Sequence, residues 1–357
     1  MAHPLLPGIT SRIVETPRLR QHVLSSGDPA GTPVVFLDGN LSTARFWEET
    51  MLALPPSYLA LAPDMRGYGD SEPKPIDATR GMRDFSDDLR ALLGALGLLG
   101  KKVHLVGWSA GSAVAMQYAI DNADGVASLT LTAPMSPYGF GGTRDTSGKP
   151  TSPDWAGTGG GTASKDLVER MRAGDTGADS PFSPRVVLRQ FYFKAPFSLP
   201  QEREDVFVEE ILKTRLGDDN YPGDLVTVAT WPGVAPGDRG MNNAISGKHC
   251  DVSAFAEVAP GPDVLWIRGA DDQIVSDTSL FDLSFLGQIG AVPGWPGLDA
   301  CPPQPMIGQM RAVLGAYSKN GGRHEEIAIP DCGHSPHLEK PGIWNRAVFD
   351  FIAARSR

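Results

Sequence analysis

The chain has 357 residues, of which 41% are hydrophobic, so it can bury one large core without division into several domains. Its net charge of −10 argues against nucleic acid or an anionic membrane as a partner. The three cysteines, Cys250, Cys301 and Cys332, have neither metal-ligand spacing nor the pattern of a disulfide framework. Because no signal peptide and no membrane-spanning run is visible, we expect a soluble, cytoplasmic protein.

Short apolar runs alternate with helix-forming segments up to about Ala133. After a hairpin at 12–24, the pattern predicts buried strands at 34–37, 58–61, 103–106 and 128–132, and helices at 43–53, 84–99 and 112–119. Alternation of this kind is typical of an α/β fold with a mostly parallel, doubly wound sheet and helices on both faces.

Two stretches interrupt this alternation. Residues 134–259 are rich in glycine, proline and aromatic residues and predict only short helices, at 165–172, 185–193 and 203–216. Strands return at 263–268 and 326–329, so the core domain is expected to consist of residues 1–133 and 260–357. Between these strands, proline and glycine dominate residues 278–310, where we expect a loop rather than a helix. We expect this loop insertion to form a second wall of the substrate pocket, with a surface excursion far from the site as the alternative.

Residues 107–111 have the sequence G-W-S-A-G and lie between a predicted strand and a predicted helix. Strand, G-x-S-x-G and helix form a nucleophile elbow, in which a strained turn lifts the Ser109 hydroxyl clear of the sheet. Gly107 and Gly111 carry no Cβ, so the strand and helix backbones can approach each other closely. Ser109 is therefore the candidate nucleophile.

A nucleophilic serine needs a base, and the base needs an orienting acid. His334 follows the last predicted strand, and Asp271 and Asp272 follow the strand at 263–268. Loops at the carboxyl ends of strands hold the working groups of an open α/β sheet. The chain order serine, acid, histidine differs from the orders in chymotrypsin and subtilisin. The neighbouring His337 lies where a helix begins, and we interpret it as a helix-start residue.

Four blocks of the sequence together resemble the α/β-hydrolase superfamily: residues 36–40, residues 64–71, the elbow, and the acid and histidine loops. The second block, D-M-R-G-Y-G-D-S, is similar to a loop of the branch that contains esterases, epoxide hydrolases and dehalogenases. The resemblance covers most of the chain outside the two insertions. It implies an α/β-hydrolase fold in which residues 134–259 form a cap or lid over the active site. It also implies Asp272 as the acid, because family members place the acid three residues after the glycine that ends the strand. Asp271 would then be a loop-capping or surface carboxylate.

The resemblance further implies an oxyanion hole made by the backbone N–H groups of Asn40 and Ala110. Family members usually have His-Gly where this chain has Asp38-Gly39. A carboxylate that faced a developing oxyanion would be unfavourable. We therefore expect Asp38 to point away from the site and to hydrogen-bond the loop backbone, as aspartate often does at turns.

These features predict a serine hydrolase without cofactor or metal site, whose triad of Ser109, His334 and Asp272 cleaves a carboxylic ester or a lactone. A serine at the elbow argues against epoxide hydrolases and haloalkane dehalogenases, which use an aspartate nucleophile. The absence of a His-Gly-Gly-Gly stretch argues against the hormone-sensitive-lipase branch. The expected partner is a small-molecule ester in a mainly apolar pocket, lined by Trp108, Phe191, Phe193 and Trp295.

Two alternatives remain open. An aminopeptidase that resembles proline iminopeptidases would bind the substrate ammonium through an acidic segment of the cap, although a solvated helix face explains the same residues, Glu202, Glu204, Glu209 and Glu210. A ligand receptor built on a retired hydrolase would bind a similar molecule without turnover. Asp64 and Arg66 of the second block are interpreted as structural. The sequence does not predict the oligomeric state.

Overall fold

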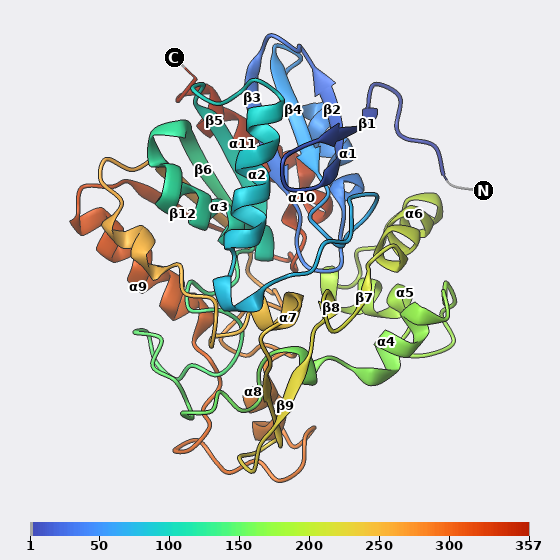
Figure 1. Cartoon of the computed structure of the whole chain (residues 1–357), viewed down its shortest axis with the longest axis vertical. Helices are drawn as coiled ribbons and strands as arrows, with labels where there is room; N and C mark the ends of the chain where they lie inside the picture. Colours follow the sequence, from blue (N-terminus) through green and yellow to red (C-terminus); the bar gives the residue numbers. More distant parts are fainter. Residues whose placement is uncertain (1–2, 357) are drawn as a thin grey trace.

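The computed structural model describes residues 3–356, with a sheet of eight strands at its centre (Figure 1). The strands lie in the order β1-β2-β4-β3-β5-β6-β11-β12. Their bounds are Thr10–Glu15 (β1), Arg20–Gly27 (β2), Thr32–Leu37 (β3), Tyr58–Pro63 (β4), Val103–Trp108 (β5), Val126–Thr132 (β6), Asp263–Gly269 (β11) and His324–Ile329 (β12).

The sheet is parallel from β4 through β3, β5, β6 and β11 to β12, whereas β2 pairs antiparallel with both β1 and β4. The predicted α/β class with a mostly parallel sheet is confirmed. Every residue of β5 is buried, as expected for a central strand that is covered on both faces. Because the parallel strands share one direction, the loops after β3, β5, β11 and β12 leave the same edge of the sheet.

Helices cover both faces of this sheet (Figure 1). Neighbouring residues of β5, Leu105 and Val106, belong to two different apolar clusters, because successive side chains of a strand point to opposite faces. The first cluster includes side chains from α2 (Arg83–Ala95), α3 (Ala110–Asn122) and α9 (Met306–Lys319). The second includes side chains from α1 (Glu48–Ala53), which follows the 3₁₀ turn η1 (Ala44–Trp47), and from α11 (Pro341–Ala353). Further short turns are η2 (Ala78–Arg80), η3 (Ala123–Gly125), η6 (Ser253–Glu257) and α10 (Pro336–Glu339).

Residues 134–259, drawn green to yellow in Figure 1, contain short elements and one longer helix, α6 (Gln201–Leu212). Helix α4 (Lys165–Arg172) has the predicted bounds, and Ser164 caps its first turn by accepting from Leu167 N. The predicted helix at 185–193 is instead α5 (Pro184–Val187) followed by a π-helical turn, η5 (Leu188–Tyr192). The other elements are η4 (Gly160–Thr162), α7 (Met241–Ala244) and the paired short strands β7 (Leu216–Gly217), β8 (Tyr221–Pro222), β9 (Leu225–Thr227) and β10 (Val234–Pro236).

Residues 278–310 differ from the expected loop in two places. They include a short helix, α8 (Leu283–Gln288), which the sequence prediction missed, and α9 already begins at Met306. Asp282 starts α8 by accepting from Ser284 N. The buried glutamine Gln304 ties the insertion to residues 139–141, donating to Gly139 O at 3.0 Å and accepting from Gly141 N at 2.6 Å. Among the helices of the described residues, none combines the length and the apolar composition needed to cross a bilayer.

Candidate active site

The turn between β5 and α3 carries Ser109. This residue has φ 55° and ψ −120°, a left-handed backbone conformation that is strained for a residue with a Cβ. A Cβ on Gly107 would lie 2.5 Å from the Gly111 carbonyl oxygen, and one on Gly111 would lie 2.4 Å from the carbonyl oxygens of Leu37 and Asp38. Both glycines therefore permit the close approach that the elbow motif predicts.

The loops after β11 and β12 bring Asp272 and His334 together. His334 Nδ1 lies 2.7 Å from Asp272 Oδ2, and both side chains are almost fully buried. The other Asp272 oxygen accepts from the backbone N–H groups of Ile274 and Val275 at 2.8 and 2.9 Å, which fixes the carboxylate in its loop. This arrangement can orient the His334 ring so that Nε2 is available as a base.

The side chain of Asp271 points to the surface and not to His334. Its carboxylate is 44% exposed and pairs with Lys194 Nζ at 2.8 Å. The hydrogen bond from Lys194 is the main cause that lowers the pKa of Asp271. Of the two neighbouring aspartates, the structure thus brings Asp272 to the histidine and leaves Asp271 at the surface.

Two buried side chains hold the histidine loop. Trp108 donates its indole N–H to the His334 carbonyl oxygen at 2.8 Å. Glu339 accepts from Gly333 N at 2.9 Å and from Ser335 N at 3.3 Å, on either side of the histidine. In the described chain no hydrogen bond joins the Ser109 hydroxyl to His334. Such contacts are often long before substrate binds.

Gly39 and Asn40 follow β3, and Gly39 lies against the elbow. A Cβ on Gly39 would lie 3.1 Å from the Ser109 Cβ, so this turn packs directly against the candidate nucleophile. Within residues 3–356, the backbone N–H groups of Asn40 and Ala110 donate to no protein acceptor. Unpaired N–H groups beside a serine are what an oxyanion hole requires.

The sequence of this region matches known proteins. Residues 32–172 match a family model described as "alpha/beta hydrolase fold". Together with the sheet order and the elbow, this match shows that the chain has the α/β-hydrolase fold.

Proteins similar to this chain include an epoxide hydrolase and two esterases. Soluble epoxide hydrolase of Corynebacterium sp. (strain C12) is 36% identical over 112 residues, which are 31% of this chain and 37% of the relative. A thermophilic esterase from Thermogutta terrifontis has a TM-score of 0.57 at 18% identity, with 98% of this chain and 100% of that chain covered. Carboxylesterase from Bacillus subtilis also has a TM-score of 0.57, at 14% identity, with 97% and 92% covered. These structures are alike in fold, whereas the alignment to the epoxide hydrolase spans little more than a third of its length.

The side chain of Asp38 does not make the backbone hydrogen bond that we expected. It is fully buried, and within the described residues neither carboxyl oxygen has a hydrogen-bond partner. Burial raises the pKa of Asp38 well above its usual value, and the nearby carboxyl groups of Asp64 and Glu210 raise it further. The expected backbone hydrogen bond of Asp38 was wrong for a physical reason. Asp64 and Glu210 come from distant segments of the chain, so the local turn sequence does not show what surrounds Asp38.

The predicted pocket residues lie in different surroundings. Trp108 is 1% exposed within the second apolar cluster. Phe193 is buried against Phe197, with ring centroids 5.1 Å apart, and Phe191 meets Phe281 of the 278–310 insertion at 5.0 Å. Trp295 packs on Gly287 and donates to the Cys301 carbonyl oxygen at 2.9 Å.

Tyr192, which the sequence did not single out, lies next to the candidate site. Its ring meets that of Trp108 edge-on at 5.7 Å and that of His334 at 6.2 Å. The aromatic run 191–193 was a visible signal, but it did not indicate which of its three members faces the histidine. His337 is the second residue of α10, at the start of a helix as predicted, and its ring stacks on that of Trp47 with centroids 4.3 Å apart.

The acidic residues of α6 are mostly engaged by basic partners. Glu204 is buried and pairs with Arg185 and Arg189, and these bonds outweigh its burial and lower its pKa. Glu210 is buried between Lys213, at 2.9 Å, and the Thr43 hydroxyl, at 2.9 Å. Neither carboxylate is thus left unpaired for a substrate ammonium. Glu209 is partly exposed, with His3 at 3.7 Å, and Glu202 is exposed.

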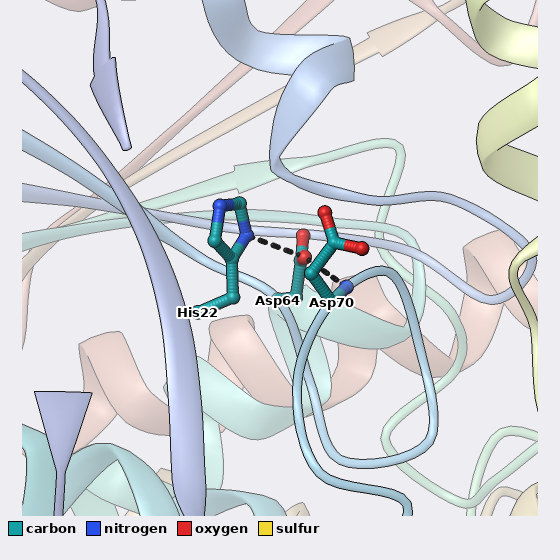
Figure 2. A group of neighbouring side chains, drawn as sticks. All are labelled: His22, Asp64 and Asp70. Carbon is teal, nitrogen blue, oxygen red and sulfur yellow. Dashed lines mark hydrogen bonds and ion pairs between the residues drawn. The ribbon is translucent and has the colours of Figure 1, made fainter. Parts of the chain in front are cut away.

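A second polar group, His22, Asp64 and Asp70, has the spacing of a metal site (Figure 2). Its atoms are already used: His22 Nδ1 bonds Asp64 Oδ2 at 2.7 Å, and Asp70 N donates to the same oxygen at 2.9 Å. Lys213 pairs with the Asp70 carboxylate at 3.0 Å. Ser11 Oγ, on the exposed edge strand β1, lies 2.8 Å from His22 Nε2 on β2, and with Asp64 these residues make a second Ser-His-Asp line. Because Asp64 anchors the backbone here, we interpret the group as structural.

Proposed function

We propose that this protein of the α/β-hydrolase fold is a serine hydrolase that cleaves carboxylic esters, lactones included, without a cofactor. The observation that carries the proposal is the 2.7 Å contact between Asp272 and His334 at the same sheet edge as the strained Ser109 elbow. Strain at a non-glycine residue marks a functional position when the surrounding structure enforces it. The esterases of like fold are consistent with this activity.

In the proposed acylation, Ser109 Oγ attacks the ester carbonyl carbon while His334 Nε2 takes the hydroxyl proton. Asp272 holds the ring through Nδ1 and stabilises the imidazolium. The N–H groups of Asn40 and Ala110 donate to the oxyanion of the tetrahedral intermediate. When that intermediate collapses, the C–O bond to the leaving alcohol breaks and His334 returns the proton to the alcohol.

Deacylation repeats these steps with water. His334 removes a proton from a water molecule, whose oxygen attacks the acyl carbon of the Ser109 ester. The second tetrahedral intermediate collapses with cleavage of the bond to Ser109 Oγ. The proton passes from His334 to Ser109, and the carboxylic acid product leaves.

We further propose that residues 134–259 cap this site and that residues 278–310 contribute a wall. The proximity of Tyr192 to His334 supports the first assignment, and the contact between Phe191 and Phe281 supports the second. An aromatic lining favours neutral, apolar esters over charged ones.

A substrate panel tests the proposal. We expect p-nitrophenyl acetate, butyrate and octanoate to be hydrolysed, with prolyl and alanyl p-nitroanilides as poor substrates. A fluorophosphonate probe should label Ser109, identified by mass spectrometry of the digested protein. Labelling at another serine, or a clear preference for aminoacyl anilides, would contradict the proposed activity.

A further inference from the structure

The turn that carries the Asn40 N–H has an unusual conformation. Leu41, directly after Asn40, has φ 55°, in the left-handed region that a leucine adopts only at a cost. The surrounding structure must therefore hold the turn in place. An oxyanion donor is effective only when its direction is fixed before the reaction begins.

Tyr192 supplies one external bond to this turn. Its hydroxyl donates to the carbonyl oxygens of Asn40 at 3.1 Å and Leu41 at 3.3 Å. The tyrosine is 6% exposed and ends the π-helical turn η5, a rare element that occurs often at functional sites. Its hydroxyl thus holds the two peptide units that follow the Asn40 N–H.

A second external bond comes from α7. Asn40 Nδ2 donates to Asn242 Oδ1 at 3.0 Å, while Tyr68 donates to the other atom of the same amide, Asn40 Oδ1, at 2.6 Å. Tyr68 belongs to the core domain. Tyr192 and Asn242 both belong to residues 134–259, so this segment bonds the turn through the backbone and through the Asn40 side chain.

We propose that Tyr192 and Asn242 are positioning residues that aim the Asn40 N–H at the oxyanion. The inference rests on the proposed ester hydrolysis and deepens it. Residues 134–259 would then stabilise the transition state in addition to enclosing the substrate. A residue that only lines the pocket affects substrate binding, whereas one that aims the oxyanion donor affects the chemical step.

Tyr192→Phe tests this directly, because it removes the hydroxyl and keeps the ring. We expect kcat for p-nitrophenyl butyrate to fall by roughly tenfold or more, which is a smaller fall than removal of a whole oxyanion donor causes. KM should change less than twofold. Tyr317→Phe is the matched control. Tyr317 is also buried and donates to a backbone carbonyl, Pro262 O at 2.7 Å, at the amino end of β11. This control should lose comparable thermal stability while keeping kcat.

Inhibitors supply a readout that packing alone would not change. Phenylboronic acid forms a tetrahedral adduct with a nucleophilic serine, whereas benzamide resembles the planar ground state. We expect Tyr192→Phe to raise the inhibition constant of phenylboronic acid by about the same factor by which kcat falls. The inhibition constant of benzamide should stay unchanged. Equal weakening of both inhibitors would overturn the inference.

Asn242→Ala is the second variant, at a half-buried position that tolerates truncation better. It should show the same loss in kcat without a change in KM. If both variants hydrolyse ester like the Tyr317→Phe control, or if only KM changes, the positioning role is wrong. These outcomes leave the proposed function standing as long as activity depends on Ser109. A wild type without Ser109-dependent hydrolysis would instead remove the proposed function itself.

Discussion

Trp108 donates its indole N–H to the carbonyl oxygen of His334 at 2.8 Å, so the residue before the candidate nucleophile holds the loop of the candidate base. Trp108→Phe should break this bond and leave the buried carbonyl without a partner, at a cost of about 1–3 kcal/mol in the free energy of unfolding. We also expect kcat to fall, because His334 loses its fixed position. Urea denaturation and ester kinetics measure the two effects.

Trp266→Phe is the control for that prediction. Trp266 is 1% exposed, like Trp108, but its indole N–H has no hydrogen-bond partner within the described residues. Replacing it should therefore leave kcat near the wild-type value. Equal losses of kcat in both variants would show that ring volume, and not the bond to His334, matters.

Ser109→Ala should abolish ester hydrolysis, with a loss on the order of 10⁴-fold or more in kcat, because only binding and the oxyanion hole remain. Ser11→Ala is its control, since Ser11 belongs to the other Ser-His-Asp line, with His22 and Asp64. Its activity should match the wild type. Steady-state kinetics of the two purified variants show which serine is the nucleophile. A large loss of kcat in Ser11→Ala would mean that the active site lies at the edge strand β1.

Asp272→Asn should reduce kcat by orders of magnitude, because an amide cannot hold the His334 ring and stabilise its charged form as the carboxylate does. Asp271→Asn should change kcat little, since its carboxylate faces Lys194 at the surface. Parallel kinetics of the two variants with p-nitrophenyl butyrate measure the difference. The reverse ranking would show that the wrong aspartate orients the base.

Asp38→Asn should stabilise the protein increasingly as the pH rises. The pKa of Asp38 is raised above its unfolded value of about 3.9, so its contribution to stability is full below that pH and declines as the pH rises toward the folded pKa. Asparagine has no such decline. The free energy of unfolding of the variant minus that of the wild type should grow between pH 5 and pH 8, by at most about 1.4 kcal/mol per pH unit.

Urea denaturation across this pH range provides the measurement for Asp38. Asp271→Asn serves as the control. Because the pKa of Asp271 is lowered, its contribution to the free energy of unfolding is already complete at pH 5. The free energy of unfolding of this variant minus that of the wild type should therefore stay constant between pH 5 and pH 8. A difference for Asp38→Asn that stays flat or shrinks would mean that Asp38 is ionised in the folded protein.

The elbow at Ser109 and the contact between Asp272 and His334 could be predicted because they depend on local patterns: a glycine-flanked serine between strand and helix, and polar residues directly after strands. From those patterns alone Asp271 and Asp272 were equivalent, and the family resemblance favoured the residue that the structure places beside His334. The parallel sheet was predictable for the same reason, since apolar runs and their spacing are local.

Asp38 and Tyr192 were not predictable in this way. A rule for aspartate at turns predicted a backbone bond for Asp38, but its neighbours Asp64 and Glu210 come from other segments. Tyr192 lies in a run of three aromatic residues whose directions depend on the geometry of the turn that contains them. Asn242 is one of two adjacent asparagines, and only the folded chain places it beside Asn40.

The π-helical turn Leu188–Tyr192 contains one residue more than an α-helical turn would need. This extra residue determines the directions in which the aromatic side chains of residues 191–193 point. Removing one residue would rotate the following side chains by about 100° around the helix axis. The hydroxyl of Tyr192 would then leave Asn40, and a phenylalanine ring would turn toward His334 instead. A single-codon deletion at Val187 or Leu188 is thus expected to reproduce the kcat loss of Tyr192→Phe while the amino-acid composition of the run stays the same. A deletion in this turn can therefore remove the hydroxyl from this position without any substitution.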